Sequence, residues 1–414
     1  MYSGDALAAS CRDLEENLSQ ILPIQIIHVS TSHTGGAGIA ARRLSAALGD
    51  AGYASLFMAC ANQAFVPNHN EISIQRTLKQ RLKGALLARV QRAISSKTYF
   101  TLGSIGAIEA SSLKGYPRNN LVIHVHNWFN LADLIFFREL LLQGFRLVFT
   151  LHDMRLLTGG CHYSLNCHNY LKSCDSCPFL PSFFRGIPPR NLANFRELLT
   201  QFSTQIELIC PSVWLQTLAV ESQILPKESI HFIPNVHNWQ NPNISDATMI
   251  QRNNPQSIDI GVASLDVTSP LKGGDFLSEI IKIASVTKPQ INFVFLNDYD
   301  SRGENQEGFW ENIDYLMVTS RADNSPNVIH EAKLRQVPVI ATEVGGITEL
   351  LNPKIDIPID IDDLTPDEFI EMLEVLRLNL TSSRPRSMDL HYLDYVEGAL
   401  QKTIAVYQNL LIKT

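Results

Sequence analysis

The chain has 414 residues, of which 45% are hydrophobic and 18% are charged, and it carries a formal net charge of −7. This length predicts two or three domains with a sizeable buried core. The acidic balance argues against a protein that binds nucleic acid. No run of roughly 18 apolar residues, the length that spans a bilayer, is present.

The N-terminal stretch "MYSGDALAASCRDLEENLSQ" carries acids and has no basic region ahead of an apolar core. It therefore predicts no secretory signal. Cys11, Cys60 and Cys210 are scattered and odd in number, which argues against a disulfide framework. We expect a reduced, cytoplasmic protein.

Strand-like and helix-like segments alternate through the first half of the chain. Several of the strand-like runs are almost continuously apolar, as expected of parallel strands that are buried on both faces. This alternation is typical of α/β folds. The predicted strands cover residues 24–30, 54–60, 121–127, 145–153, 206–212 and 230–235.

A glycine-rich turn follows the first predicted strand. Gly35, Gly36 and Gly38 let the backbone approach an anion closely, and the helix that follows favours phosphate at its N-terminus. The turn is not a GxGxxG motif, and no acid lies about twenty residues further on, which disfavours an NAD site. A turn needed only for packing is the alternative.

The stretch 76–97, "RTLKQRLKGALLARVQRAISSK", holds seven Lys or Arg residues and no acid. Leu78, Leu82, Leu86 and Val90 recur every four residues, which predicts an amphipathic basic helix. Two interpretations remain open, namely docking onto an anionic membrane surface and an ordinary solvated helix face.

The stretch 159–178, "GGCHYSLNCHNYLKSCDSCP", contains four of the seven cysteines of the chain. Four thiolates at such spacing could bind Zn²⁺ tetrahedrally, although one pair is looser than the usual CxxC knuckle. The alternative is that small buried cysteines pack a long loop. The candidate ligands of a structural zinc ion are Cys161, Cys167, Cys174 and Cys177, with His162 and His168 as substitutes.

The second half repeats the α/β pattern after a polar stretch rich in Asn, which predicts a linker over 236–256. A helical, amphipathic tail should pack back on the junction between two Rossmann-like domains. We expect domains over 22–235 and 257–387 and a helical segment over 388–414. The strands of the second domain are predicted at 257–264, 291–297, 313–320 and 338–344.

The richest stretch is "SRADNSPNVIHEAKLRQVPVIATEVGGITEL", residues 320–350. Asp323 and Glu331 lie eight residues apart, and the turn "DNSPN" between them predicts the start of the helix that carries Glu331. Acids at the carboxyl end of a sheet suit the hydroxyl groups of a sugar or ribose. Exposed backbone amides at the same place suit phosphate.

This stretch resembles the E-x7-E region of retaining GT-B glycosyltransferases of family 4, with Asp323 and Glu331 in the two acidic positions. Other segments resemble the same family in the same order, from about 24 to 352: "GGAGIAARRLSAAL", "TLHD" (150–153), "CPSVWLQTLAVES…IHFIPN" and "LKGG" (271–274). The version with "TGGCHYS" and the cysteine run is similar to bacterial enzymes of exopolysaccharide assembly, such as those of colanic acid biosynthesis.

The resemblance implies a retaining transfer of a sugar from a UDP- or GDP-sugar to a lipid-linked or surface-polysaccharide acceptor, with no cofactor required for catalysis. It also implies an acceptor-side first domain and a shortened, nucleotide-sugar-binding second domain. The membrane interpretation of 76–97 would place the cytoplasmic protein at the inner face of the membrane. The implied catalytic residues are His152, Lys272 and Asp323. The implied substrate-binding residues are Gly35, Gly36, Lys272, Asn324, Ser325, Pro326, Asn327 and Glu331.

Two features depart from the family pattern. Many members carry an arginine shortly before the lysine turn, and "GVASLDVTSPLKGG" has none. Relatives usually have a further helix and strand between the positions of Lys272 and Asp314, beside the nucleotide base. A catalytically inactive paralogue that acts as a scaffold is therefore the alternative to an active enzyme. A zinc-dependent nucleic-acid module is a third class, which the acidic balance opposes.

Overall fold

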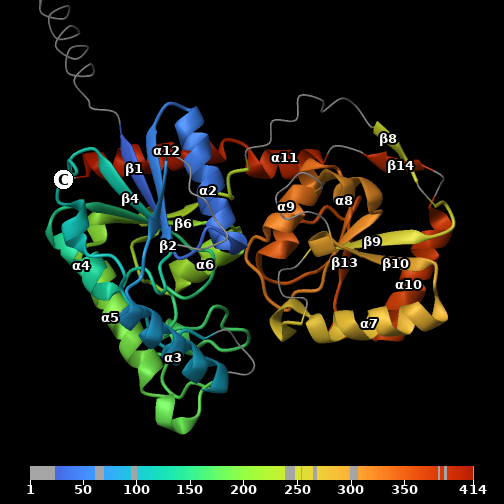
Figure 1. The fold of residues 1–414 in the computed structure, drawn as a ribbon, viewed down its shortest axis with the longest axis horizontal. Helices are drawn as coiled ribbons and strands as arrows, with labels where there is room; N and C mark the ends of the chain where they lie inside the picture. The colour runs from blue at the N-terminus through green and yellow to red at the C-terminus, as the bar shows by residue number, and fades with distance from the viewer. Residues whose placement is uncertain are drawn as a thin grey trace, which may run out of the picture.

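The computed structural model describes residues 24–60, 70–94, 100–237, 248–252, 254–263, 268–298, 306–380, 383–386 and 389–413. Two α/β domains lie side by side (Figure 1), each built on a parallel sheet with helices on its faces. The expectations for the N-terminal stretch and for most of the linker fall outside the described residues.

The first domain has a seven-stranded sheet in the order β3-β2-β1-β4-β5-β6-β7, in which every pairing is parallel. The strands are β1 (Gln25–Ser30), β2 (Ala54–Cys60), β3 (Glu71–Ile74), β4 (Leu121–Asn127), β5 (Arg146–Thr150), β6 (Ile206–Cys210) and β7 (Ile230–Phe232). The helices are α2 (Gly35–Asp50), α3 (Leu78–Ile94), α4 (Leu134–Leu142), α5 (Ile187–Gln201) and α6 (Val213–Glu221).

The second domain has a five-stranded parallel sheet in the order β10-β9-β11-β12-β13. Its strands are β9 (Ile258–Val262), β10 (Ile291–Phe295), β11 (Tyr315–Val318), β12 (Val339–Thr342) and β13 (Ile357–Ile359). Its helices are α7 (Gly274–Thr287), α8 (Gln306–Asn312), α9 (Asn327–Leu334) and α10 (Pro366–Asn379). Among the described residues a 3-10 turn, Leu296–Asp298, and the short helix α8 separate β10 from β11, in line with the short stretch seen in the sequence.

Both sheets reverse their winding direction next to their first strand, between β1 and β4 and between β9 and β11. In open α/β sheets such a switch point leaves a crevice at the carboxyl ends of the two strands, where ligands bind. The glycine turn follows β1, and the lysine turn and Asp323 follow β9 and β11. The fold therefore brings the predicted site residues to the two switch points.

The lack of periodicity predicted a wholly irregular linker, but the structure places a strand within it. Residues Thr248–Gln251 form β8, which pairs antiparallel with β14 (Ser383–Arg386) on the second domain. The pairing partner lies more than a hundred residues away in the chain, so no local pattern announces it.

The C-terminal tail crosses from one domain to the other, as predicted. The helix α11 (Leu390–Val396) is fixed to the second domain because Asp389, its N-cap, forms an ion pair with the buried Lys333 of α9. The helix α12 (Ala399–Ile412) packs on α2, β5 and β6 of the first domain. There Tyr407 is buried, and its hydroxyl lies 2.6 Å from Nδ1 of His124.

Candidate active site

Lys272 and Asp323 meet at the switch point of the second sheet. Lys272 ends a short turn after β9, and its ammonium group forms an ion pair with the Asp323 carboxylate, which follows β11. Gly273 makes this approach feasible, because it has φ +70° and a Cβ there would lie 2.0 Å from the Thr319 carbonyl oxygen. The pair places one positive and one negative group at the edge of the crevice.

Asn324 joins the second domain to the first. Its Nδ2 donates to the Leu151 carbonyl at the end of β5 over 2.9 Å, and its Oδ1 accepts from the Ser212 hydroxyl over 2.5 Å. Gly346 allows the close approach, since a Cβ at this position would lie 1.9 Å from the Asn324 carbonyl oxygen. Asn324 is buried, so the second sheet's switch point packs closely against the carboxyl ends of β5 and β6, in a contact called the seam below.

The glycine turn lies against the start of α9. The Gly36 carbonyl accepts from Nδ2 of Asn327 over 2.9 Å. Further along the same two helices, Nη2 of Arg43 in α2 lies 2.5 Å from Oε1 of Glu331 in α9. The carboxylate that the sequence assigns to ribose hydroxyls is therefore paired with an arginine of the other domain.

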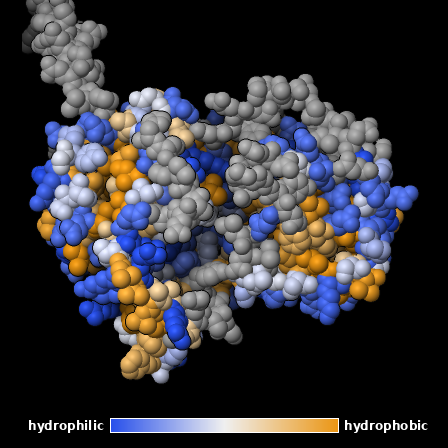
Figure 2. All heavy atoms as spheres, viewed as in Figure 1, coloured by the Kyte–Doolittle hydropathy of each residue, from blue (hydrophilic) through white to orange (hydrophobic). Residues whose placement is uncertain are grey.

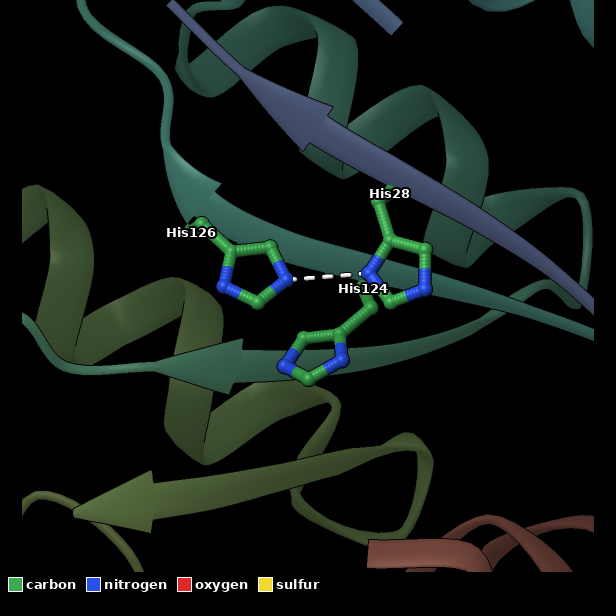
Figure 3. Close-up of side chains that lie close together, drawn as sticks. All are labelled: His28, His124 and His126. Carbon is green, nitrogen blue, oxygen red and sulfur yellow. Dashed lines mark hydrogen bonds between the residues drawn. The ribbon is translucent and has the colours of Figure 1, made fainter. Parts of the chain in front are cut away.

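A chain of three histidines ends at His152, the residue two positions after β5. Nε2 of His152 lies 3.2 Å from Nδ1 of His126, and Nε2 of His126 lies 3.0 Å from Nδ1 of His28 (Figure 3). Burial lowers the pKa of His28 to about 3 and of His152 to about 4. For His126 burial, followed by the neighbouring histidines, lowers the pKa well below its ordinary value. The chain is therefore neutral near pH 7 and fixes the orientation of the His152 ring.

His28, His124 and His126 bring ring nitrogens within 4.8 Å of one another, which raises the question of a metal ion (Figure 3). Their surroundings favour hydrogen bonds instead. His124 lies between the Tyr407 hydroxyl, at 2.6 Å, and the Thr150 hydroxyl, at 2.7 Å. Since both nitrogens of His124 and both of His126 have such partners, the cluster is a hydrogen-bond network.

The remaining predicted residues frame the same seam. Ser325 donates to or accepts from Nε2 of His330 at 2.7 Å, and Pro326 is the N-cap of α9. His152 borders a small cavity of about 20 Å³ beneath α2, together with His126 and Asn235. The four loop cysteines lie apart from this seam, around a second small cavity.

This chain resembles known proteins in its fold. No model of a known protein family matches the sequence, and no curated protein matches it. Sucrose-phosphate synthase from Thermosynechococcus elongatus superimposes with a TM-score of 0.59 at 15% identity, covering 94% of this chain and 100% of that one. HepE of Anabaena, solved with UDP-glucose, gives 0.54 at 16% identity, covering 94% and 98%. TarM gives 0.55 at 10% identity, covering 95% and 99%.

The chain has the GT-B fold. The likeness to these structures extends over 94% of the chain, and the two Rossmann-like domains and the returning C-terminal helix are the features that the sequence predicted. This confirms the predicted fold class.

Sequence reasoning missed several residues of the GT-B seam. The pattern "HVH" in β4 was a usable signal for the histidine network, because residues two apart in a strand share a face. Arg43 carried no such signal, since its partner Glu331 is 288 residues away. Glu349 gave no signal either, because its carboxylate accepts from the backbone N–H groups of Val213 and Trp214 at the start of α6, more than a hundred residues away.

Proposed function

We propose that this protein is a retaining glycosyltransferase that moves a hexose from a nucleotide-sugar donor to a glycan or lipid-linked acceptor. The observation that carries the proposal is the pairing of Lys272 with Asp323 at a switch point whose next residue, Asn324, binds the Leu151 carbonyl beside His152. A cation at this position suits a diphosphate, and a carboxylate suits sugar hydroxyls. The start of α9 adds a helix N-terminus, which favours the same negative charge.

The chemistry assigns a separate task to each group. The bond between the anomeric carbon and the diphosphate oxygen breaks, and the acceptor oxygen bonds to that carbon on the same face. The proton of the acceptor hydroxyl passes to the departing phosphate. Lys272 stabilises the negative charge that grows on the diphosphate, which is an electrostatic contribution to the transition state. Because this charge comes from a side chain, we expect no metal requirement for the transfer.

Asp323 and Glu331 would hold the donor by its hydroxyl groups. Asp323 accepts from the hexose, and Glu331 accepts from the ribose once the donor displaces Arg43. Gly35 and Gly36 leave room for the diphosphate, since a Cβ at Gly35 would meet nothing within 4 Å. His152, neutral and fixed by His126, would orient the sugar beside the leaving group.

The experiment is a panel of UDP- and GDP-hexoses tested by calorimetry for binding and by NMR for transfer or slow hydrolysis. We expect one base and one hexose to bind, and the product to keep the anomeric configuration of the donor. Glu331→Ala should weaken that binding. If no donor binds or is turned over, and Glu331→Ala matches the wild type, the proposed function is wrong.

The helix α3 supports an acceptor that is held at a membrane. Leu78, Leu82 and Leu86 are 72%, 63% and 65% exposed on its outer side, and basic side chains flank them. Figure 2 shows hydrophobic residues gathered at the end of the first domain where α3 and the start of α5 lie. None of the described helices is long and apolar enough to cross a bilayer. We therefore propose peripheral docking onto an anionic membrane from the cytoplasmic side.

Vesicle sedimentation tests the docking. The protein should bind vesicles that contain phosphatidylglycerol, and it should dissociate in high salt and fail to bind phosphatidylcholine vesicles. The triple variant L78S/L82S/L86S should lose the binding while donor affinity stays unchanged. Equal binding of the variant and the wild type would contradict membrane docking.

A second candidate is a scaffold protein with the GT-B fold and no activity. Two observations favour it, namely the five-stranded second sheet and the ion pairs that already occupy Glu331 and Asp323. Calorimetry separates the two candidates, because an inactive scaffold would show no heat of binding for any nucleotide sugar.

A further inference from the structure

The four cysteines of the loop between β5 and α5 surround one small cavity. Their side chains line a space of about 20 Å³, enough for a single water or ion, together with Thr158 and Tyr170. Cys161, Cys174 and Cys177 are buried, and none of the six described cysteines forms a disulfide. The loop thus gathers four free thiols around a cavity large enough for a single ion.

Backbone amides lie against two of the cysteine sulfurs. Amide N–H groups of Phe179 and Leu180 point at the sulfur of Cys177, and that of Gly159 points at the sulfur of Cys174. Amide donors aimed at cysteine sulfur are the outer-shell contacts that orient metal ligands and adjust their charge.

The short run between the last two cysteines of the loop forms a turn. The residue pair Cys174 and Ser176 has positive φ, 57° and 55°, which folds "CDSC" into a tight turn with both sulfurs at the cavity.

We propose that Cys161, Cys167, Cys174 and Cys177 form a structural Zn²⁺ site of the tetrathiolate type. Closed four-sulfur sites with zinc–sulfur bonds of about 2.3 Å are structural in character and leave no position for substrate. Such bonds set the sulfurs about 3.8 Å apart. No three of these sulfurs in the described chain lie within 4.8 Å of one another, so zinc binding draws the loop inward and releases up to four protons.

The histidines of the run serve other contacts. Nε2 of His162 lies 3.1 Å from the Thr101 hydroxyl, and its Nδ1 lies 3.6 Å from the Asp153 carboxylate. His168 is exposed, outside the cavity lining. The ligand set is therefore four sulfurs, and the histidine substitutes that the sequence allowed are not needed.

The site holds together one wall of the domain seam. Tyr163, two residues after Cys161, packs with Leu271 and Ala322, the neighbours of Lys272 and Asp323. On its other side the loop supports α3, because Cys161 and Cys177 share a buried cluster against which Leu87 and Val90 pack. Zinc would thus stiffen the path from the exposed helix α3 to the seam.

Metal analysis of the purified full-length chain tests the site without reference to glycosyl transfer. Protein expressed without a metal-affinity tag should contain about one zinc ion per chain after dialysis against a weak chelator. Replacement by Co²⁺ should give the intense visible absorption of a tetrahedral thiolate site. A thiol-modifying mercurial should release the zinc in step with the modification of four thiols.

Variants separate ligands from other buried cysteines. Cys174→Ser and Cys161→Ser should lose the bound zinc, whereas Cys60→Ser and Cys210→Ser, which replace buried cysteines elsewhere, should retain it. Folded wild-type protein that contains no zinc and takes up no Co²⁺ would overturn the proposal. A disulfide between any two of the four cysteines, found by peptide mapping of protein kept anaerobic, would overturn it as well.

Discussion

The two sides of the domain seam present different kinds of polar group. Apart from Arg43, the first domain contributes a neutral wall, whose members are buried imidazoles with lowered pKa values: His28, His126 and His152. The second domain contributes a charged wall, whose members lie at the crevice and form ion pairs: Lys272, Asp323 and Glu331. Under the proposed function this difference divides the labour: the charged wall would bind and stabilise a charged ligand, and the neutral wall would orient it.

The largest expected effect falls on the charged wall. Lys272→Met should lower kcat about 10²- to 10³-fold, because it removes the cation that stabilises the departing diphosphate. Steady-state kinetics with the preferred donor measure the loss. The control is Lys282→Met on the exposed side of α7, which should leave kcat unchanged. An equal response of both variants would show that Lys272 has no special role.

Glu331→Ala should raise KM for the donor about 10- to 100-fold with a smaller change in kcat, as expected for the loss of hydrogen bonds to a charged group. Arg43→Ala provides the comparison, because it removes the ion-pair partner and keeps the carboxylate. This second variant should not raise KM. If both variants raise KM alike, the ion pair matters for structure and the carboxylate is not a donor ligand.

The contact between the walls depends on Asn324. Asn324→Ala leaves the Leu151 carbonyl and the Ser212 hydroxyl without this partner inside a buried seam. We expect the free energy of unfolding to fall by about 1–3 kcal/mol, as for other unpaired buried polar groups. Urea unfolding measures the change, with the exposed Asn379→Ala as the control. Unchanged stability would mean that the domains do not rest on this residue.

Because the buried histidines have lowered pKa values, the free energy of unfolding should fall as the pH falls. The pKa of His28 is about 3 in the folded chain and near 6.5 when unfolded, so its contribution is complete above pH 6.5 and is lost as the pH falls. At pH 5 this costs about 2 kcal/mol for each such histidine. His28→Leu should lose about 2 kcal/mol less than the wild type between pH 7 and pH 5.

Denaturation at both pH values measures that difference, and the exposed His391→Leu is the control. A variant that keeps the full dependence of the wild type on pH would place the acid-sensitive groups elsewhere.

The smallest effect should come from the loop side of the charged wall. The Tyr163 hydroxyl donates to Oδ1 of Asp323 over 3.5 Å, which is long for an O–H donor. Tyr163→Phe should therefore change kcat/KM only a few-fold, since a weak hydrogen bond contributes about 1 kcal/mol or less. Kinetics with the preferred donor check this. A loss as large as that of Lys272→Met would make Tyr163 part of the reacting centre.

The sequence predicted the longer strands because their apolar runs are continuous and end at turn residues. It missed β3 and β13, which have four and three residues, too few to show a periodicity. It also missed β8, whose pairing with β14 depends on residues far away in the chain.

For the site, the motifs put Lys272 and Asp323 after two strands of the second sheet, and these strands, β9 and β11, are neighbours in the structure. The contacts across the seam could not be predicted in this way. Asn324 was expected near the sugar through its backbone, but its side chain binds Leu151 and Ser212. Arg43 lies within an otherwise ordinary helix. Both roles arise from how the two domains meet, which no local pattern encodes.

A crystal structure of the protein with a nucleoside diphosphate and hexose tests the central claim most directly. The account predicts the diphosphate beside the Lys272 ammonium group and the start of α9, the ribose at Glu331 in place of Arg43, and the hexose between Asp323 and His152. Nucleotide bound away from this seam, or a seam that stays closed by the Arg43–Glu331 pair at saturating ligand, would contradict it.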